Sequence, residues 1–194
     1  MRLATSPSIL QAGRDEKETK LKDFITAHLT ARTAKEIDAS NRIYTIVVRA
    51  PDSPAAKALT LLAPELAAAG IALRVLLLDT DSASDEGGQK SILKLANAEI
   101  RLLSDPRFAA AHEQLVLGNG RVWIGDCMRR DPTKRDAFEM FHADNTAAAR
   151  HAEVSFARMW KLGKPTKRMK PVTTKHVIAG QKVAKPERRP ATRR

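Results

Sequence analysis

Two short apolar runs flank a glycine-rich turn near the middle of the chain. Leu115–Leu117 and Val122–Ile124 lie on either side of Gly118-Asn119-Gly120. Asn-Gly between β-forming residues indicates a hairpin, because both residues tolerate the positive φ that a tight turn needs. We therefore predict two antiparallel strands, with Trp123 facing the opposite side of the sheet from its two neighbours.

Four more apolar runs predict the rest of a sheet. Ile43–Val48 and Ile71–Leu78 are continuous apolar segments, which is typical of strands buried on both faces. Glu99–Leu103 and Ala137–Phe141 are predicted to add further strands. Because these runs alternate with helical segments, the sequence predicts an α/β fold with a mixed β-sheet flanked by helices.

Three segments carry apolar residues at the spacing of a helix that buries one face. The first covers residues 16–38, and its charged residues, Lys17 included, are expected off the buried stripe. The second follows Ser53, its expected N-cap, is interrupted by Pro64 and stops at Gly70. The buried stripe of the third comprises Ala148, Ala152, Phe156, Met159 and Trp160.

Two polar loops separate these elements. Asp79–Gly88 is interpreted as a solvated acidic loop before a short helix over Gln89–Ala96. A metal site is the alternative, but the acid spacing matches no calcium loop, so no metal is predicted. Asp126–Asp136 follows a strand end, where ligand crevices open in α/β folds. Its candidate phosphate ligands are Arg129, Arg130, Lys134 and Arg135.

Adjacent arginines such as those of the second loop can hold a phosphate bidentately, which lysine cannot do. The same residues equally fit a surface cluster of ion pairs with Asp131, Asp136 and Glu139. The spacing does not decide between these interpretations.

The positive charge is concentrated at the C-terminus. Residues 161–194 contain 12 Lys or Arg and one acid, Glu187, whereas the other 160 residues contain 22 basic and 21 acidic residues. Residues 163–194 also contain four prolines and few apolar residues, which predicts a disordered basic tail after Gly163. Its candidate nucleic-acid contacts are Lys164, Lys167, Arg168, Lys170, Arg188 and Arg189.

Composition restricts the class of protein further. Cys127 is the one cysteine, so an intramolecular disulfide is excluded and a reducing cytoplasm is the expected location. The chain has no apolar run of 18 residues, which argues against a membrane-spanning helix. We divide the chain into an irregular leader at residues 1–15, one domain at residues 16–162 and the basic tail at residues 163–194.

The hairpin resembles the signature of the phospholipase D superfamily, which is His-x-Lys, four residues, Asp and then Gly-Ser-x-x-Asn after the next strand. His112 matches the nucleophile, while Gln114 stands at the Lys position and Asn119 at the Asp position, with Gly118 as the alternative for the last. Gly125 matches the later Gly. Asp126 replaces the Ser, and Met128 or Arg129 replaces the Asn.

The resemblance covers residues 16–162, which correspond to one degenerate half-unit of the superfamily. It implies a phospholipase-D-like mixed sheet, with Glu139 as the carboxylate that orients His112. Members of the superfamily cleave phosphodiesters through a phosphohistidine formed between two facing half-units. Activity of this chain would therefore require a homodimer.

Two functional hypotheses follow. The degenerate motif favours a non-catalytic module that binds phosphate-rich partners, nucleic acid first, through its basic loop and tail. The alternative is a homodimeric phosphodiesterase or nuclease acting through His112, in which Arg129 or Arg130 replaces the lost charge. An anionic membrane surface is a less favoured partner of the tail. Neither hypothesis requires a cofactor.

Overall fold

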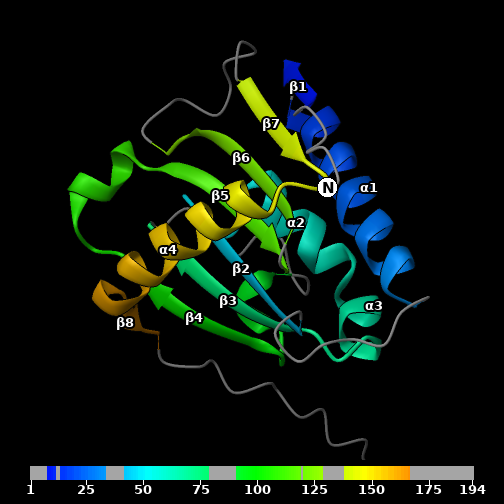
Figure 1. Cartoon of the computed structure of the whole chain (residues 1–194). Helices are drawn as coiled ribbons and strands as arrows, with labels where there is room; N and C mark the ends of the chain where they lie inside the picture. The colour runs from blue at the N-terminus through cyan, green and yellow to red at the C-terminus, as the bar shows by residue number, and fades with distance from the viewer. Residues whose placement is uncertain are drawn as a thin grey trace, which may run out of the picture.

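The computed structural model describes residues 8–11, 14–33, 42–78, 91–118, 120–128 and 138–166. Within these residues the chain forms one mixed sheet of eight strands in the order β1-β7-β6-β5-β2-β3-β4-β8 (Figure 1). The strands are β1 (Ser8–Gln11), β2 (Ile43–Val48), β3 (Ala72–Leu77), β4 (Ala98–Leu102), β5 (His112–Leu117), β6 (Arg121–Cys127), β7 (Phe138–His142) and β8 (Lys164–Pro165).

Helices cover both faces of the sheet (Figure 1). One face carries α1 (Arg14–Thr33), α2 (Pro54–Leu61) and α3 (Ala63–Ala68), and the other carries α4 (Thr146–Leu162). Two short 3₁₀ helices, η3 (Ile92–Lys94) and η4 (Pro106–Ala110), lie in the connections. None of the helices in the described ranges is long and apolar enough to cross a membrane.

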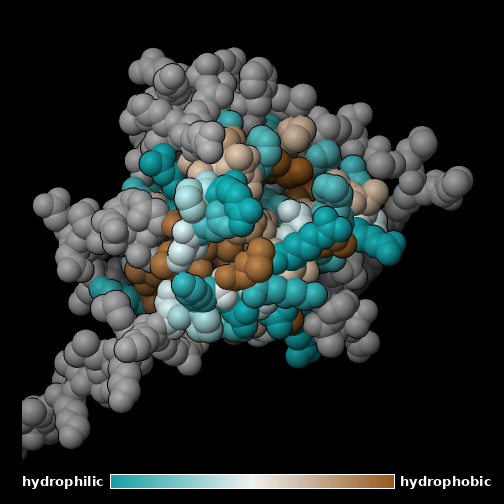
Figure 2. Space-filling view, turned by 90° about the vertical axis from the view of Figure 1, so that its left-hand side faces the viewer, coloured by the Kyte–Doolittle hydropathy of each residue, from teal (hydrophilic) through white to brown (hydrophobic). Residues whose placement is uncertain are grey.

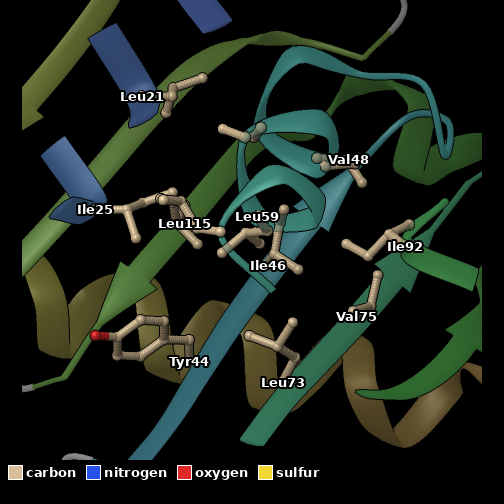
Figure 3. Packing of buried hydrophobic residues seen from close by; sticks show 14 of the residues in the cluster. Leu21, Ile25, Tyr44, Ile46, Val48, Leu59, Leu73, Val75, Ile92 and Leu115 are labelled. Carbon is tan, nitrogen blue, oxygen red and sulfur yellow. The ribbon is translucent and has the colours of Figure 1, made fainter. Parts of the chain in front are cut away.

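The alternating side chains of the central strands fill a core on each face. On β2, Tyr44, Ile46 and Val48 pack toward α1 and α2, whereas Val47 belongs to the core under α4. Figure 3 shows Leu21 and Ile25 of α1 reaching the first of these cores. The sheet is parallel from β2 through β3 to β4 and antiparallel elsewhere, which agrees with the predicted mixed α/β architecture.

The predicted hairpin is confirmed. Leu115 pairs with Trp123 and Val116 with Val122 in antiparallel register. Trp123 packs in the core under α1, whereas Val122 packs in a core under α4, as the alternation predicted. At the start of the turn, Gly118 has a left-handed φ of 69°.

Proline and glycine positions also shape the helices as predicted. The second helical segment is divided into α2 and α3 just before Pro64, and Gly70 follows with φ of 64°. Ser53 lies at the N-cap, but its hydroxyl accepts a hydrogen bond from Ala50 N at 3.2 Å and does not cap a backbone N–H of α2. Ser53 is therefore the N-cap by position, as predicted, without a capping hydrogen bond from its side chain.

Three other predictions differ from the structure. Residues 8–11 were expected in an irregular leader, yet they pair with β7 as an antiparallel edge strand. Lys164 was expected in a disordered tail, yet β8 pairs with β4 at Leu102. Between residues 91 and 96, only η3 is helical where a longer helix was predicted. The two errors at β1 and β8 concern short segments whose structure depends on pairing with a distant part of the chain.

Candidate functional site

His112 begins β5 at a register shift in the hairpin and is exposed. Its Nδ1 lies 2.9 Å from the carbonyl oxygen of Gly125. Because a carbonyl can only accept, Nδ1 must carry the hydrogen of this bond. In the neutral ring Nε2 is then the unprotonated atom, so His112 retains the chemical form that a nucleophile requires.

Gln114, which was assigned from the sequence to the position of the signature Lys, is buried beneath α4. Its Nε2 donates a hydrogen bond to the carbonyl oxygen of Ala152 at 3.1 Å. The side chain thus ties β5 to α4 and supplies no charge to a phosphate. The structure places this motif position in the sheet–helix interface.

The positions after the second strand are also occupied by structural contacts. A Cβ on Gly125 would lie 2.6 Å from Cη2 of Trp123, so the glycine leaves room for the indole. Asp126 Oδ1 accepts a hydrogen bond from Cys127 N at 2.8 Å. Met128 is buried in the apolar cluster under α4. Gly125 and Met128 therefore have a packing role where the signature would have a phosphate turn.

Glu139 is fully buried on the opposite face of the sheet from Gln114. Its Oε2 accepts a hydrogen bond from Nε1 of Trp123 at 2.6 Å, and its Oε1 forms an ion pair with Lys17 of α1. The ring of His112 instead bonds to Gly125. The expected contact between Glu139 and His112 is therefore replaced by a contact network that includes Lys17 and Trp123.

The Glu139 network contains a second acid, Glu113. Glu113 Oε1 accepts a hydrogen bond from the backbone N–H of Arg49 at 2.9 Å. Burial raises the pKa of both carboxyls, while the positive charge of Lys17 acts in the opposite direction on each pKa. The neighbouring charge of Asp126 raises the pKa of Glu139 further.

Sequence reasoning missed Lys17 and Glu113. Lys17 was expected off the buried stripe of the first helix, but it lies four and eight residues before Leu21 and Ile25, which are both fully buried. Its place on that stripe was thus visible in the i, i+4 spacing. Glu113 offered a weaker signal, namely an acid immediately before a run of buried strand residues.

Several predicted site residues lie outside the described part of the chain. They are Asn119, the loop cations Arg129, Arg130, Lys134 and Arg135, and the tail cations from Lys167 onward. Lys164 is described, and it is exposed on β8. The acidic loop at residues 79–88 is also outside. Within the described ranges, no cluster of three or more His, Cys, Asp or Glu could hold a metal ion.

No protein-family model matches the chain, and no curated protein matches it. Several solved structures, in contrast, are similar to the chain. NucT from Helicobacter pylori aligns with a TM-score of 0.52 and 11% identity over 83% of this chain and 99% of that one. Nuc from Salmonella typhimurium, a phospholipase D family member, aligns with a TM-score of 0.51 and 14% identity over 84% of this chain and 99% of that one.

A third structure is TrmBL2, an archaeal chromatin protein described as showing a novel mode of DNA binding. Its TM-score is 0.50 at 11% identity, and the match covers 84% of this chain but 55% of TrmBL2. At such low identity these likenesses establish the fold alone. The chain has a phospholipase-D-like α/β fold.

Proposed function

We propose that this phospholipase-D-like chain is a non-catalytic module that binds nucleic acid through phosphate contacts. The observation that carries the first half of the proposal is the position of Gln114. It is buried and hydrogen-bonded to α4, at the point where the signature requires a lysine directed at the phosphate.

The missing charge matters because phosphoryl transfer depends on electrostatic stabilisation of the transition state. Loss of one such donor typically raises the barrier by about 2.7–4 kcal/mol. The carboxylate expected to orient the histidine is also engaged elsewhere, since that of Glu139 is paired with Lys17 and Trp123. The site would thus have a histidine nucleophile with neither the cation nor the carboxylate expected beside it.

The binding half of the proposal rests on charge and on likeness. Residues 161–194 contain 12 Lys or Arg against one acid, and the loop after β6 carries Arg129, Arg130, Lys134 and Arg135. Counterion release gives such segments affinity for nucleic acid without sequence preference. The description of TrmBL2 as a DNA-binding chromatin protein is consistent with this partner.

The activity test uses the purified full chain with a bis-aryl phosphate and with DNA as substrates. We expect no turnover above that of the His112→Ala variant. Turnover that His112→Ala abolishes would overturn the proposal. Turnover equal in both proteins would have to come from another site or a contaminant. A third variant, His151→Ala, is the control for replacing a histidine, because His151 is an exposed histidine on α4.

The binding test compares the full chain with a variant in which Lys167, Arg168, Lys170, Arg188 and Arg189 are replaced by Gln. For the wild type, about five to six phosphate contacts should give a slope near −5 in a plot of log affinity against log salt, taking roughly 0.9 per contact. The tail variant should bind more weakly and with a shallower slope. Equal affinities would remove these tail cations from the mechanism.

One observation favours a second candidate, a homodimeric phosphodiesterase. His112 is exposed, and the bond from Nδ1 to Gly125 leaves Nε2 unprotonated in the neutral ring. Two such histidines facing each other across a dimer could attack phosphorus and protonate the leaving group, with Arg129 or Arg130 as the phosphate ligand. Dimerisation measured by light scattering together with His112-dependent turnover would establish this candidate.

A further inference from the structure

Trp160, near the end of α4, is surrounded by cationic side chains. The guanidinium carbon of Arg101 lies 4.3 Å from the centre of its indole ring, and that of Arg74 lies 5.9 Å away. Arg101 also donates a hydrogen bond from Nη1 to the carbonyl oxygen of Trp160 at 2.9 Å. Phe156 stacks on the same indole with ring centres 5.2 Å apart. These contacts fix the position of Arg101.

The two arginines come from neighbouring strands and share a face of the sheet. Arg74 on β3 is opposite Glu99 on β4, and Arg101 follows Glu99 by two residues. Glu99 lies 3.2 Å from Arg101 and is the acid paired with it among the described residues. Arg74 is exposed, and the side chain of Arg101 is 25% exposed. Because both guanidinium groups lie against one ring, they repel each other, and one acid does not balance two cations.

Three more cations lie near Trp160 in the chain, two in the last turns of α4 and one on β8, which pairs with β4 at Arg101 and Leu102. Arg158, Lys161 and Lys164 are all exposed. A single cation at the C-terminus of a helix is ordinary, because it compensates the helix dipole. Arg101 already satisfies that requirement through Trp160. We name the group Arg74, Arg101, Arg158, Lys161 and Lys164 the α4 cation cluster.

The α4 cation cluster lies where the domain continues into the basic tail. β8 pairs with β4, and Thr166, the last described residue, donates a backbone hydrogen bond to Ile100 O at 3.1 Å. The next tail cation after Lys164 is Lys167, which follows Thr166 directly. Figure 2 looks onto the side of the molecule where α4 ends, and it shows hydrophilic residues around a hydrophobic area in the middle of the described surface.

We propose that the α4 cation cluster binds the phosphate backbone of duplex nucleic acid and thereby aligns the duplex with the start of the basic tail. This inference rests on the proposed nucleic-acid binding and adds a folded docking surface to it. Fixed arginines suit phosphate contacts, since the planar guanidinium matches phosphate geometry. A phosphate would also relieve the repulsion between Arg74 and Arg101.

The aromatic contacts decide between duplex and single strand. Proteins that bind single strands offer aromatic rings on which successive bases stack. Here the Trp160 ring is already in contact with Phe156 and Arg101, so it serves to hold the arginine and not to receive a base. The cluster therefore offers cations without a stacking platform, which fits a duplex whose bases remain paired.

The test uses the full chain and two triple variants of equal net charge. The first replaces Arg158, Lys161 and Lys164 by Gln. The matched control replaces Lys20, Lys22 and Lys57 by Gln, which are exposed residues of α1 and α2 on the other face of the sheet. Arg101 is left intact because its contacts with Trp160 also support the fold. Circular dichroism checks that both variants fold like the wild type.

Binding is measured by fluorescence anisotropy with a mixed-sequence duplex at about 50 mM and about 200 mM salt, a range over which phosphate contacts dominate the change in affinity. The cluster variant should lose about tenfold or more in affinity at the lower salt, and its salt slope should become shallower by about 2–3, at roughly 0.9 per lost contact. The control variant should change much less. A single strand of the same sequence should bind more weakly than the duplex.

Three outcomes would overturn the inference. Equal losses in the two triple variants would mean that net charge alone matters. An unchanged cluster variant, beside a tail variant that loses binding, would place all phosphate contacts in the tail. Tighter binding of the single strand would contradict the choice of duplex. If the wild type itself bound no duplex, the proposed function would fail first and the inference with it.

Discussion

The two faces of the sheet differ in the charge of the polar side chains that they bury. On the face under α1 and α2, the carboxylate of Glu139 is buried and paired with Lys17 and Trp123. On the face under α4, the buried polar side chain of Gln114 is neutral and makes one hydrogen bond to Ala152. The cations of the α4 face lie at its solvent-exposed end around Trp160.

This difference has a consequence for both stability and function. Burying a charge is costly unless it is paired, so the α1 face should be sensitive to the loss of any partner of Glu139. A neutral buried amide carries a smaller penalty. Glu139, the candidate catalytic carboxylate, thus contributes to the stability of the fold. The cations available to a ligand lie on the other face of the sheet.

The largest effect is expected for Lys17→Met. This change leaves the Glu139 carboxylate buried without its cation and should reduce the free energy of unfolding by about 3–5 kcal/mol at neutral pH. Urea denaturation measures it, with Lys20→Met, an exposed residue of the same helix, as the control. The loss should be smaller in acid, where Glu139 takes up a proton. Equal effects of the two variants would show that the ion pair does not stabilise the fold.

The next largest effect on the free energy of unfolding is expected for Trp123→Phe. It keeps an aromatic ring in the core but removes the N–H that Glu139 accepts at 2.6 Å. A hydrogen bond to a charged group contributes about 1.5–3 kcal/mol, so a decrease of that size in the free energy of unfolding is expected. Combining Trp123→Phe with Glu139→Gln tests the coupling, because the two effects should not add. Strict additivity would mean that the indole acts through packing alone.

A smaller and pH-dependent effect is expected for Glu113→Gln. Burial raises the pKa of Glu113 above its ordinary value of 4.5, so the folded state binds a proton more readily than the unfolded state. The contribution of this group to stability is therefore complete below that value and is lost as pH rises through the folded-state pKa. Compared with the variant, the wild type should gain stability as pH falls from neutrality toward 4.5.

The pH prediction is measured by urea denaturation of both proteins at a series of pH values. The Gln variant keeps an oxygen that can accept from Arg49 N, so its stability should vary less over this interval. Parallel pH profiles for the two proteins would contradict the assignment of the raised pKa to Glu113.

The smallest effect is expected for Gln114→Leu on the α4 face. Ala152 lies inside α4, where a carbonyl also accepts a backbone hydrogen bond within the helix, so loss of the Gln114 amide leaves it satisfied. The free energy of unfolding should change by about 1 kcal/mol or less, as for an ordinary neutral hydrogen bond. A loss comparable to that of Lys17→Met would remove the contrast between the two faces.

Much of the fold could be predicted from local pattern. The bounds of β2, the pairing of β5 with β6 and the division of α2 from α3 follow from hydrophobic period and from the positions of Gly and Pro. The two strands that were not predicted, β1 and β8, have few residues and gain their structure from pairing with β7 and β4. Their hydrogen bonds depend on strands distant in sequence.

For the candidate site, the sequence by itself determined the residue types of the motif, and the resemblance predicted their roles: His112 as the nucleophile, Gln114 in place of a lysine and Glu139 as the later carboxylate. Only the tertiary structure decided what each side chain contacts. His112 bonds to Gly125, Gln114 to α4 and Glu139 to Lys17 and Trp123.

The physical reason is that a sequence pattern describes residues close together in the chain, whereas a tertiary contact joins residues far apart in it. The period of apolar residues is a local property, set by how successive side chains point along a helix or strand. A hydrogen bond or ion pair joins whichever groups the packed elements bring within about 3 Å, whatever their separation in sequence. Lys17 meets Glu139, and Arg101 meets Trp160, only because helices pack on a completed sheet.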